Sequence, residues 1–272
     1  MLIIACLPPG NIWPFNMVKI EAIFSDYDGT LSPLELRRED AFISLRLRRL
    51  LTKASKQIRL GIITTKDLSF IQERVPFAHG IAATCGLELQ VGDRIITDER
   101  IREPNEKFEK VYRECLKRIL QIRDNVSVER KETDDGELIG FCIDWRLARD
   151  WSEAQRKTMP LLEFCKEQAM YVVESNISPF ANVFPVEVSK GEAFARLRKE
   201  MAVDGPIMYL GDSEVDNPAF QLADISVGVK HRRTRPELFC KYWIEFLELE
   251  TFLSDLIEAN FDFQEKMIKS SA

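Results

Sequence analysis

The sequence predicts an α/β protein, in which a parallel β-sheet is covered by helices on both faces and a smaller α+β domain is inserted into it. Two observations predict this architecture. Short apolar runs alternate with longer helical patterns toward both ends of the chain, which is typical of a parallel sheet. In the middle of the chain the order changes to helix, strand, strand, helix, strand, strand, which suits a small antiparallel sheet covered by two helices.

The first half of the sheet is expected within residues 17–97. Apolar runs predict strands at Ile20–Phe24, Ile58–Thr64 and Gly80–Thr84, followed by a hairpin of Leu87–Val91 and Arg94–Thr97. Helices are predicted at Asp40–Ala54 and Leu68–Val75. The second helix is expected to end before Pro76, because the residue before a proline avoids helical backbone angles.

The inserted domain is expected at residues 98–182. Its predicted helices are Pro104–Ile122 and Trp151–Gln168. Its predicted strands are Val126–Lys131, Leu138–Arg146, Met170–Glu174 and, at the boundary with the core, Val183–Val188. The polar turn at residues 133–136 separates the first two strands and predicts that they pair as a hairpin.

The sheet pattern resumes within residues 183–272. The elements predicted there are helix Lys190–Met201, strand Pro206–Leu210, short helix Asn217–Ala223, strands Ile225–Val229 and Tyr242–Phe246, and helix Leu249–Phe261. Residues 17–97 and 183–272 are therefore expected to form one Rossmann-like core. Residues 1–16 contain three prolines and a glycine after a short apolar start, and we expect them to be a loose N-terminal extension.

Composition excludes several classes of function. The net charge is −6, so non-specific nucleic-acid binding is not expected. No segment is apolar over a length that crosses a bilayer, and no membrane partner is expected. The six cysteines form no Cys-x-x-Cys pair and there are only two histidines, which argues against a zinc site. A cytoplasmic protein with reduced thiols, either a monomer or a small homo-oligomer, is the expectation.

The most informative stretch follows the first predicted strand, where Asp26 and Asp28 are succeeded by Gly29 and Thr30. A turn at the strand's end can direct both carboxylates into one crevice. Two carboxylates that lie so near each other repel one another, and a cation between them is favoured, most simply Mg²⁺. One carboxylate is then suited to attack phosphorus while the other shuttles the proton. The alternative interpretation is a strand that simply ends in an acidic turn.

Three further motifs lie where core strands end or helices begin. Thr64 and Thr65 follow the second strand, where a hydroxyl near a helix N-terminus can bind a phosphate oxygen, and Lys66 adds a cation. Lys190 opens a helix and is suited to neutralise a nucleophile and a transferring phosphoryl group. The alternatives are an N-capping threonine and a solvated lysine.

The last motif is the Gly-Asp-Ser-Glu-Val-Asp segment of residues 211–216. Asp212 closes a predicted strand, and Asp216 lies about one helical turn further on. Acidic groups at this spacing can hold Mg²⁺ directly or through water. The alternative is an N-capped helix that has Pro218 in its first turn.

Together these motifs resemble the signature of the haloacid dehalogenase superfamily of phosphohydrolases. That signature reads Asp-x-Asp-x-Thr, a Ser or Thr, a Lys, and Gly-Asp with a further Asp, and all four parts occur here in order. The resemblance implies a nucleophile at Asp26, an acid–base group at Asp28, a phosphoryl ligand at Thr64 and a charge-balancing group at Lys190. It also implies an inserted α/β cap that closes over the substrate.

The same resemblance implies the cofactor and the contacts around the phosphoryl group. Mg²⁺ would be held by Asp26, the main-chain carbonyl of Asp28, and Asp212, with Asp216 behind or beside it. A small phosphate monoester would be the substrate. The residues implied to surround its phosphoryl group are Gly29, Thr30, Thr65 and Lys66.

Within the superfamily the chain is most like the trehalose-6-phosphate phosphatases. The segments that carry this likeness are Gly86–Leu89, Val128–Lys131, Trp145-Arg146 and Pro185. The likeness implies substrate-binding roles for the cap residues Glu129, Lys131, Arg146 and Asn182. For each of them, a surface charge or polar group on a hairpin strand is the alternative interpretation.

The chain also departs from that family. Ser213 and Asn217 replace two acidic residues of its last motif, Asn182 replaces a cap glutamate, and Thr65-Lys66 stands where Gly-Arg is usual. The form of the last motif is more similar to mannosyl-3-phosphoglycerate and related sugar-phosphate phosphatases. A sugar phosphomutase and a non-catalytic binding protein on the same fold are further alternatives.

Overall fold

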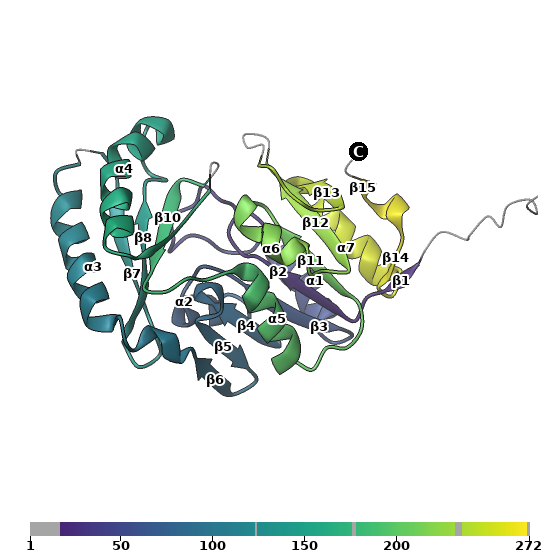
Figure 1. Cartoon of the computed structure of the whole chain (residues 1–272). Helices are drawn as coiled ribbons and strands as arrows, with labels where there is room; N and C mark the ends of the chain where they lie inside the picture. The colour runs from purple at the N-terminus through teal and green to yellow at the C-terminus, as the bar shows by residue number, and fades with distance from the viewer. Residues whose placement is uncertain (1–16, 123, 176–177, 232–235, 271–272) are drawn as a thin grey trace, which may run out of the picture.

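The computed structural model describes residues 17–122, 124–175, 178–231 and 236–270. The predicted N-terminal extension, residues 1–16, lies outside the described residues. Figure 1 shows a body built around one large sheet and a smaller unit that stands beside it. No helix in the described part of the chain is both long and apolar enough to span a membrane.

The large sheet is parallel at its centre. In spatial order, its nine strands are β15 (Lys269–Ser270), β13 (Tyr242–Glu245), β12 (Ile225–Lys230), β11 (Ile207–Gly211), β2 (Ala22–Ser25), β3 (Arg59–Ile63), β4 (Gly80–Ala83), β5 (Glu88–Val91) and β6 (Arg94–Thr97). The strands from β13 to β4 run parallel, whereas β15, β5 and β6 pair antiparallel at the two edges. The buried apolar runs of the central strands fit a sheet that is covered on both faces.

Helices cover the two faces of this sheet, as the sequence predicts. On one face lie α1 (Leu45–Ala54), α2 (Leu68–Gln72) and α7 (Leu249–Glu258), and on the other lie α5 (Lys190–Glu200) and α6 (Asn217–Phe220). Leu51 of α1 and Leu256 of α7 belong to one buried cluster, and Phe194 of α5 belongs to another. The predicted fold class of the core is therefore confirmed.

A separate antiparallel sheet lies in the middle of the chain, and its order is β7 (Ser127–Glu132), β8 (Leu138–Asp144), β10 (Phe180–Phe184) and β9 (Tyr171–Glu174). The helices α3 (Asn105–Ile119) and α4 (Trp151–Glu167) cover one face. Side chains alternate between the faces of a strand. Phe141 and Val183 therefore pack under the helices, while Cys142 and Asn182, paired across β8 and β10, lie on the other face. The boundaries 98–182 stay a prediction, and β10 crosses the second of them.

Several predicted element bounds are wrong. The strand predicted at residues 183–188 is β10, which ends at Phe184, and Pro185 directly after it has no N–H to donate to a ladder. The helix predicted from Asp40 begins at Leu45, because the Ser44 hydroxyl accepts a hydrogen bond from the N–H of Leu47 and caps it there. The paired strands β1 (Val18–Lys19) and β14 (Asp262–Phe263) are not among the predicted elements, because two residues are too few to show the apolar–polar alternation of a strand.

Candidate active site

Three of the four motifs meet at one edge of the large sheet. Asp26 follows β2, Thr64 follows β3 and Asp212 follows β11. These strands are neighbours and run parallel, so their carboxyl ends lie together. The fourth motif arrives from the helix layer, because α5 begins at Lys190. The sheet topology therefore brings together residues that lie far apart in the sequence.

Lys190 forms two buried ion pairs. Its side chain is 2% exposed, and its Nζ lies 2.9 Å from Oδ1 of Asp26 and 2.7 Å from Oδ1 of Asp216. Burial by itself lowers the pKa of Lys190, but the carboxylates of Asp216 and Asp26 outweigh it and hold that pKa above its ordinary value. The ammonium therefore stays charged beside Asp26.

Asp216 is fully buried and its carboxylate is occupied by protein donors. Besides Lys190, the hydroxyl of Tyr209 donates to Oδ1 at 2.6 Å. Oδ2 accepts from the N–H groups of Asp212 and Ser213 at 3.2 and 3.1 Å and from the Ser213 hydroxyl at 3.1 Å. Asp216 therefore fixes both Lys190 and the loop that carries Asp212.

Asp26 and Asp212 form the part of the cluster that best suits a metal ion. Ligand oxygens of Asp26, Asp212 and Asp216 all lie within 4.8 Å of one another. Burial raises the pKa of Asp26 to about 7, against the opposing charge of Lys190. Burial, followed by the charge of Asp26, raises the pKa of Asp212 well above its ordinary value. Oδ2 of Asp212 is buried and has no hydrogen-bond partner among the described residues, so a hard cation such as Mg²⁺ fits the donor set.

Gly29 allows Asp212 to approach the first motif. Its φ of +78° lies in the left-handed region, and a Cβ on it would be 2.0 Å from Oδ2 of Asp212. A larger residue would therefore displace that carboxylate. The neighbouring Thr30 is fully buried, and no described residue hydrogen-bonds its hydroxyl.

Asp28 lies between two cations. Oδ2 of Asp28 is 3.1 Å from Nζ of Lys66, which is itself buried. Burial raises the pKa of Asp28, but the charges of Lys66 and Arg146 outweigh it and bring the pKa below its ordinary value. Asp28 is therefore ionised at neutral pH in this arrangement.

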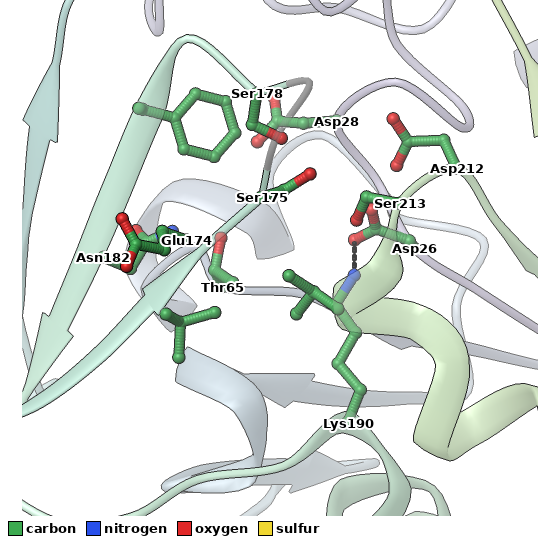
Figure 2. Close-up of a pocket in the computed structure, with 13 residues that line it drawn as sticks. Asp26, Asp28, Thr65, Glu174, Ser175, Ser178, Asn182, Lys190, Asp212 and Ser213 are labelled. Carbon is green, nitrogen blue, oxygen red and sulfur yellow. Dashed lines mark ion pairs between the residues drawn. The ribbon is translucent and has the colours of Figure 1, made fainter. Parts of the chain in front are cut away.

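Thr64 and Thr65 take different places. The hydroxyl of Thr64 is buried and accepts a hydrogen bond from the N–H of Lys66 at 3.2 Å, so it keeps its proton available to donate. Thr65 lines a pocket together with Asp26, Asp28 and Lys190 (Figure 2). This pocket encloses only about 30 Å³. On the side of the antiparallel sheet its lining includes Phe180 and Asn182.

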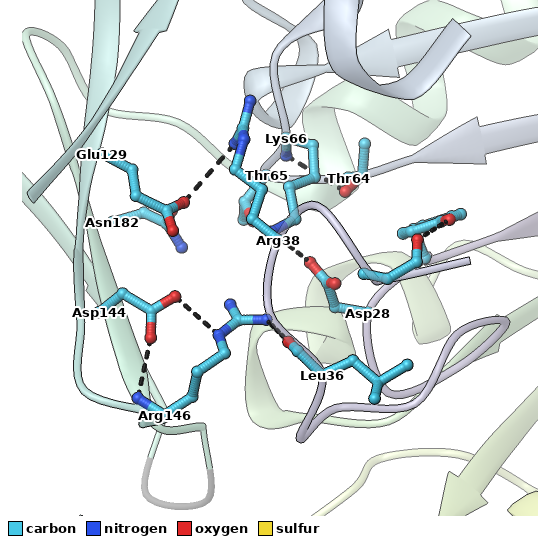
Figure 3. A network of polar contacts seen from close by, with 12 residues as sticks. Asp28, Leu36, Arg38, Thr64, Thr65, Lys66, Glu129, Asp144, Arg146 and Asn182 are labelled. Carbon is cyan, nitrogen blue, oxygen red and sulfur yellow. Dashed lines mark hydrogen bonds and ion pairs between the residues drawn. The ribbon is translucent and has the colours of Figure 1, made fainter. Parts of the chain in front are cut away.

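Figure 3 shows Glu129, Asn182 and Arg146 on the side of the small sheet that is turned toward the core, and the contact of Lys131 with the main chain of Thr65 places Lys131 there too. Of these, only Asn182 lines the pocket. Nζ of Lys131 donates to the main-chain oxygen of Thr65 at 2.5 Å and to the side chain of Asn182, and burial lowers the pKa of Lys131 to about 8. Glu129 lies 3.7 Å from Nη1 of Arg38. These contacts tie the small sheet to the core.

Arg146 makes the same kind of bridge. Its Nε lies 2.7 Å from Asp144, and its Nη1 donates at 2.6 Å to the main-chain oxygen of Leu36 in the core (Figure 3). Its buried Nη2 has no hydrogen-bond partner among the described residues. The interpretation of Arg146 as a surface charge is wrong, because its side chain is 2% exposed.

Sequence reasoning missed several residues of this site. Arg38 pairs with Asp67 and with Glu129, Tyr209 holds Asp216, and Asp144 orients Arg146. Asp144 could have been found from the sequence, because it stands two residues before Arg146 in the predicted strand Leu138–Arg146, and residues two apart in a strand share a face. Arg38 had no local signal, since its partners come from other parts of the chain.

Comparison with known proteins identifies the fold. No family model matches the chain. The phosphoglycolate phosphatase of Sulfurisphaera tokodaii is 23% identical over 207 residues, which are 76% of this chain and 80% of that protein. Phosphoglycolate phosphatase 2 of Saccharolobus solfataricus is 26% identical over 207 residues, 76% of this chain and 78% of that protein.

Solved structures are similar over most of the chain. A trehalose-6-phosphate phosphatase related protein matches 88% of this chain and 97% of its own with a TM-score of 0.68 at 17% identity. The C-terminal domain of the C. albicans trehalose-6-phosphate phosphatase matches 88% of this chain and 93% of its own, with a TM-score of 0.69 at 17% identity. A haloacid dehalogenase-like hydrolase from Bacteroides thetaiotaomicron matches 88% of this chain and 100% of its own, with a TM-score of 0.62 at 17% identity.

The fold is that of the haloacid dehalogenase-like hydrolases, which confirms the resemblance predicted from the motifs. The sequence relatives named above are both phosphatases, in agreement with the predicted class of phosphoric monoester hydrolases.

Proposed function

We propose that this protein is a Mg²⁺-dependent phosphatase that hydrolyses a small phosphate monoester through an aspartyl-phosphate on Asp26. The observation that carries the proposal is the buried cluster in which Lys190 contacts Asp26 at 2.9 Å while Oδ2 of Asp212 has no partner among the described residues. A site of this kind combines a nucleophile, a fixed cation and oxygen ligands for a metal. Phosphoryl transfer depends on these parts for positioning and charge neutralisation.

Each residue of the cluster has a separate role in the proposed reaction. Asp26 attacks phosphorus, and Lys190 offsets the negative charge that gathers on the transferring group. The hydroxyl of Thr64 donates to a phosphoryl oxygen. Asp26, Asp212 and the main-chain carbonyl of Asp28 would hold Mg²⁺, which would supply positive charge at the phosphoryl oxygens. Asp216 positions Lys190 and stands behind the metal ligands.

Asp28 transfers a proton both when the aspartyl-phosphate forms and when water hydrolyses it. A bound phosphate dianion raises the pKa of Asp28 by repulsion, which favours the protonated form that donates to the leaving oxygen. The ionised form then accepts a proton from the water that attacks the aspartyl-phosphate. Lys66, at 3.1 Å, favours this second form.

The small sheet acts as a cap in this proposal. Its contacts with the core, such as Lys131 to the main chain of Thr65, close the pocket and exclude water during transfer. The five described cysteines are buried and form no disulfide among the described residues, in keeping with the predicted reducing cytoplasm.

Two substrate classes have support. Trehalose-6-phosphate, or another phosphorylated sugar or glycoside, is the first candidate, because trehalose-6-phosphate phosphatases match the fold over most of the chain. Phosphoglycolate is the second, because both curated relatives named above are phosphoglycolate phosphatases. Mannosyl-3-phosphoglycerate, with features of both, stays an alternative within the first class.

The test is release of inorganic phosphate with Mg²⁺ and with EDTA. The panel holds trehalose-6-phosphate, glucose-6-phosphate, sucrose-6-phosphate, mannosyl-3-phosphoglycerate, phosphoglycolate and p-nitrophenyl phosphate. We expect Mg²⁺-dependent release that Asp26→Asn abolishes and that Asp93→Asn, a control on the exposed hairpin turn, leaves intact. Folded protein that releases no phosphate from any member would favour a phosphomutase or a binding role, and release by Asp26→Asn would remove Asp26 from the role of nucleophile.

A further inference from the structure

A second cavity lies directly beside the catalytic pocket. It has a volume of about 450 Å³, within the range of about 300–1,000 Å³ that is usual for small-molecule sites. Its walls are the cap strand β9, the segment 187–189 that leads from the cap to α5, and residues 214–218 after β11. We call this cavity the side groove.

The side groove and the catalytic pocket share part of their lining. Val173 and Glu174 of the cap and Lys190 and Val215 of the core line both spaces. The catalytic pocket is far smaller than the side groove, with a volume of about 30 Å³. A phosphate monoester that places its phosphorus beside Asp26 must therefore extend its remaining atoms out of that pocket, and the side groove is a contiguous space large enough for them.

The charges of the side groove are mostly negative. Glu174, Glu187 and Glu214 line it. Among the described residues that line it, Lys190 is the only cation, and its ammonium is already paired with Asp26 and Asp216. A carboxylate placed there would meet like charges and no unpaired cation among the described lining residues.

The same residues suit hydroxyl groups. One oxygen of Glu174 accepts from Lys166 at 3.0 Å and one of Glu214 accepts from Ser175 at 2.6 Å, so each carboxylate keeps a second oxygen that is able to accept. Carboxylate acceptors form strong hydrogen bonds with hydroxyls. Tyr171 and Val188 supply apolar surface on which the C–H face of a sugar ring can pack.

We propose that the side groove binds the leaving group of the substrate, and that this group is a neutral polyhydroxyl such as a sugar and not a carboxylate such as glycolate. The inference rests on the proposed phosphatase function and decides between its two substrate classes. It assigns specificity to Glu187, which no motif singled out. Glu187 is exposed, so replacing it leaves the core packing unchanged.

The test compares kcat and KM for trehalose-6-phosphate, glucose-6-phosphate, phosphoglycolate and p-nitrophenyl phosphate in three variants. Wild type is expected to prefer a sugar phosphate to phosphoglycolate at least about tenfold in kcat/KM. Glu187→Gln should raise KM for that sugar phosphate about tenfold with little change in kcat, because a hydrogen bond to a charged group is lost. Glu187→Lys should lower KM for phosphoglycolate. Glu192→Gln, a nearby exposed control that does not line the groove, should leave KM unchanged for both the sugar phosphate and phosphoglycolate.

The outcomes separate the inference from the function beneath it. Turnover of p-nitrophenyl phosphate that depends on Asp26, together with a preference for phosphoglycolate, would overturn the inference and leave the phosphatase in place. Equal effects of Glu187→Gln on all four substrates, or no effect on any, would also overturn the inference and leave the phosphatase function in place. No turnover of any substrate by folded protein would overturn the proposed function, and the inference with it.

Discussion

Glu88 should make the stability of this protein fall as pH rises toward neutrality. It lies on β5, is fully buried, and accepts a hydrogen bond at 3.4 Å from the N–H of Asp134 in the cap hairpin. Its other oxygen has no hydrogen-bond partner among the described residues. Burial, with added repulsion from Asp134, Asp67 and Asp135, raises the pKa of Glu88 from 4.5 to about 7.

The size and sign of the effect follow from this pKa. Between pH 4.5 and about 7 the folded protein keeps a proton on Glu88 that the unfolded chain has lost, so stability declines as pH rises through that range. At about 1.4 kcal/mol per pH unit, the full effect above pH 7 is about 3 kcal/mol. Glu88→Gln is neutral at every pH. It should match wild type near pH 4.5 and exceed it by about 2–3 kcal/mol at pH 8.

The assay is denaturant unfolding of wild type and Glu88→Gln at pH 5, 6, 7 and 8. The difference between the two proteins removes the contributions of other titrating groups, including Asp26. Glu99→Gln is a matched control, since Glu99 is 86% exposed and should change stability by less than about 0.5 kcal/mol. Parallel curves for wild type and Glu88→Gln across this pH range would refute the reasoning.

Three further predictions concern the catalytic cluster. Gly29→Ala, whose Cβ would lie 2.0 Å from Oδ2 of Asp212, should lower kcat/KM for p-nitrophenyl phosphate about a hundredfold, and near-normal activity would show that the contact is not needed. Lys190→Met leaves Asp26 and Asp216 buried without their cation and should cost about 3 kcal/mol in denaturant unfolding; a loss below about 1 kcal/mol would contradict the importance of these ion pairs. Mg²⁺ at about 100 times its Kd should stabilise wild type by about 3 kcal/mol in a thermal scan, reversibly with EDTA. Asp212→Asn should abolish that gain, and an equal gain in both proteins would place the ion elsewhere.

Most of the core could be predicted because its signals are local. Buried apolar runs and helical periods identify the central strands and the helices on both faces. The edges of the fold lacked such signals. The two-residue strands β1, β14 and β15 form through pairing with distant segments, and the start of β10 at Phe180 is decided by its pairing with β8 and β9.

The candidate site was predicted in outline for the same reason. Asp26, Asp28 and Asp212 each follow a recognisable strand, so their types and order can be read in the sequence. Their surroundings cannot be read there. Arg38 reaches Glu129 only because the cap lies against the core, and the buried setting of Arg146 depends on the same contact.

The sequence alone determined the fold class, the order of the motifs and the chemical types available for phosphoryl transfer, because these depend on short-range patterns along the chain. Only the tertiary structure decided what each group meets. It placed Lys190 between Asp26 and Asp216, left an oxygen of Asp212 without a protein partner, and opened an acidic groove beside the pocket. Burial and distance set these properties, and both arise when segments remote in sequence pack together.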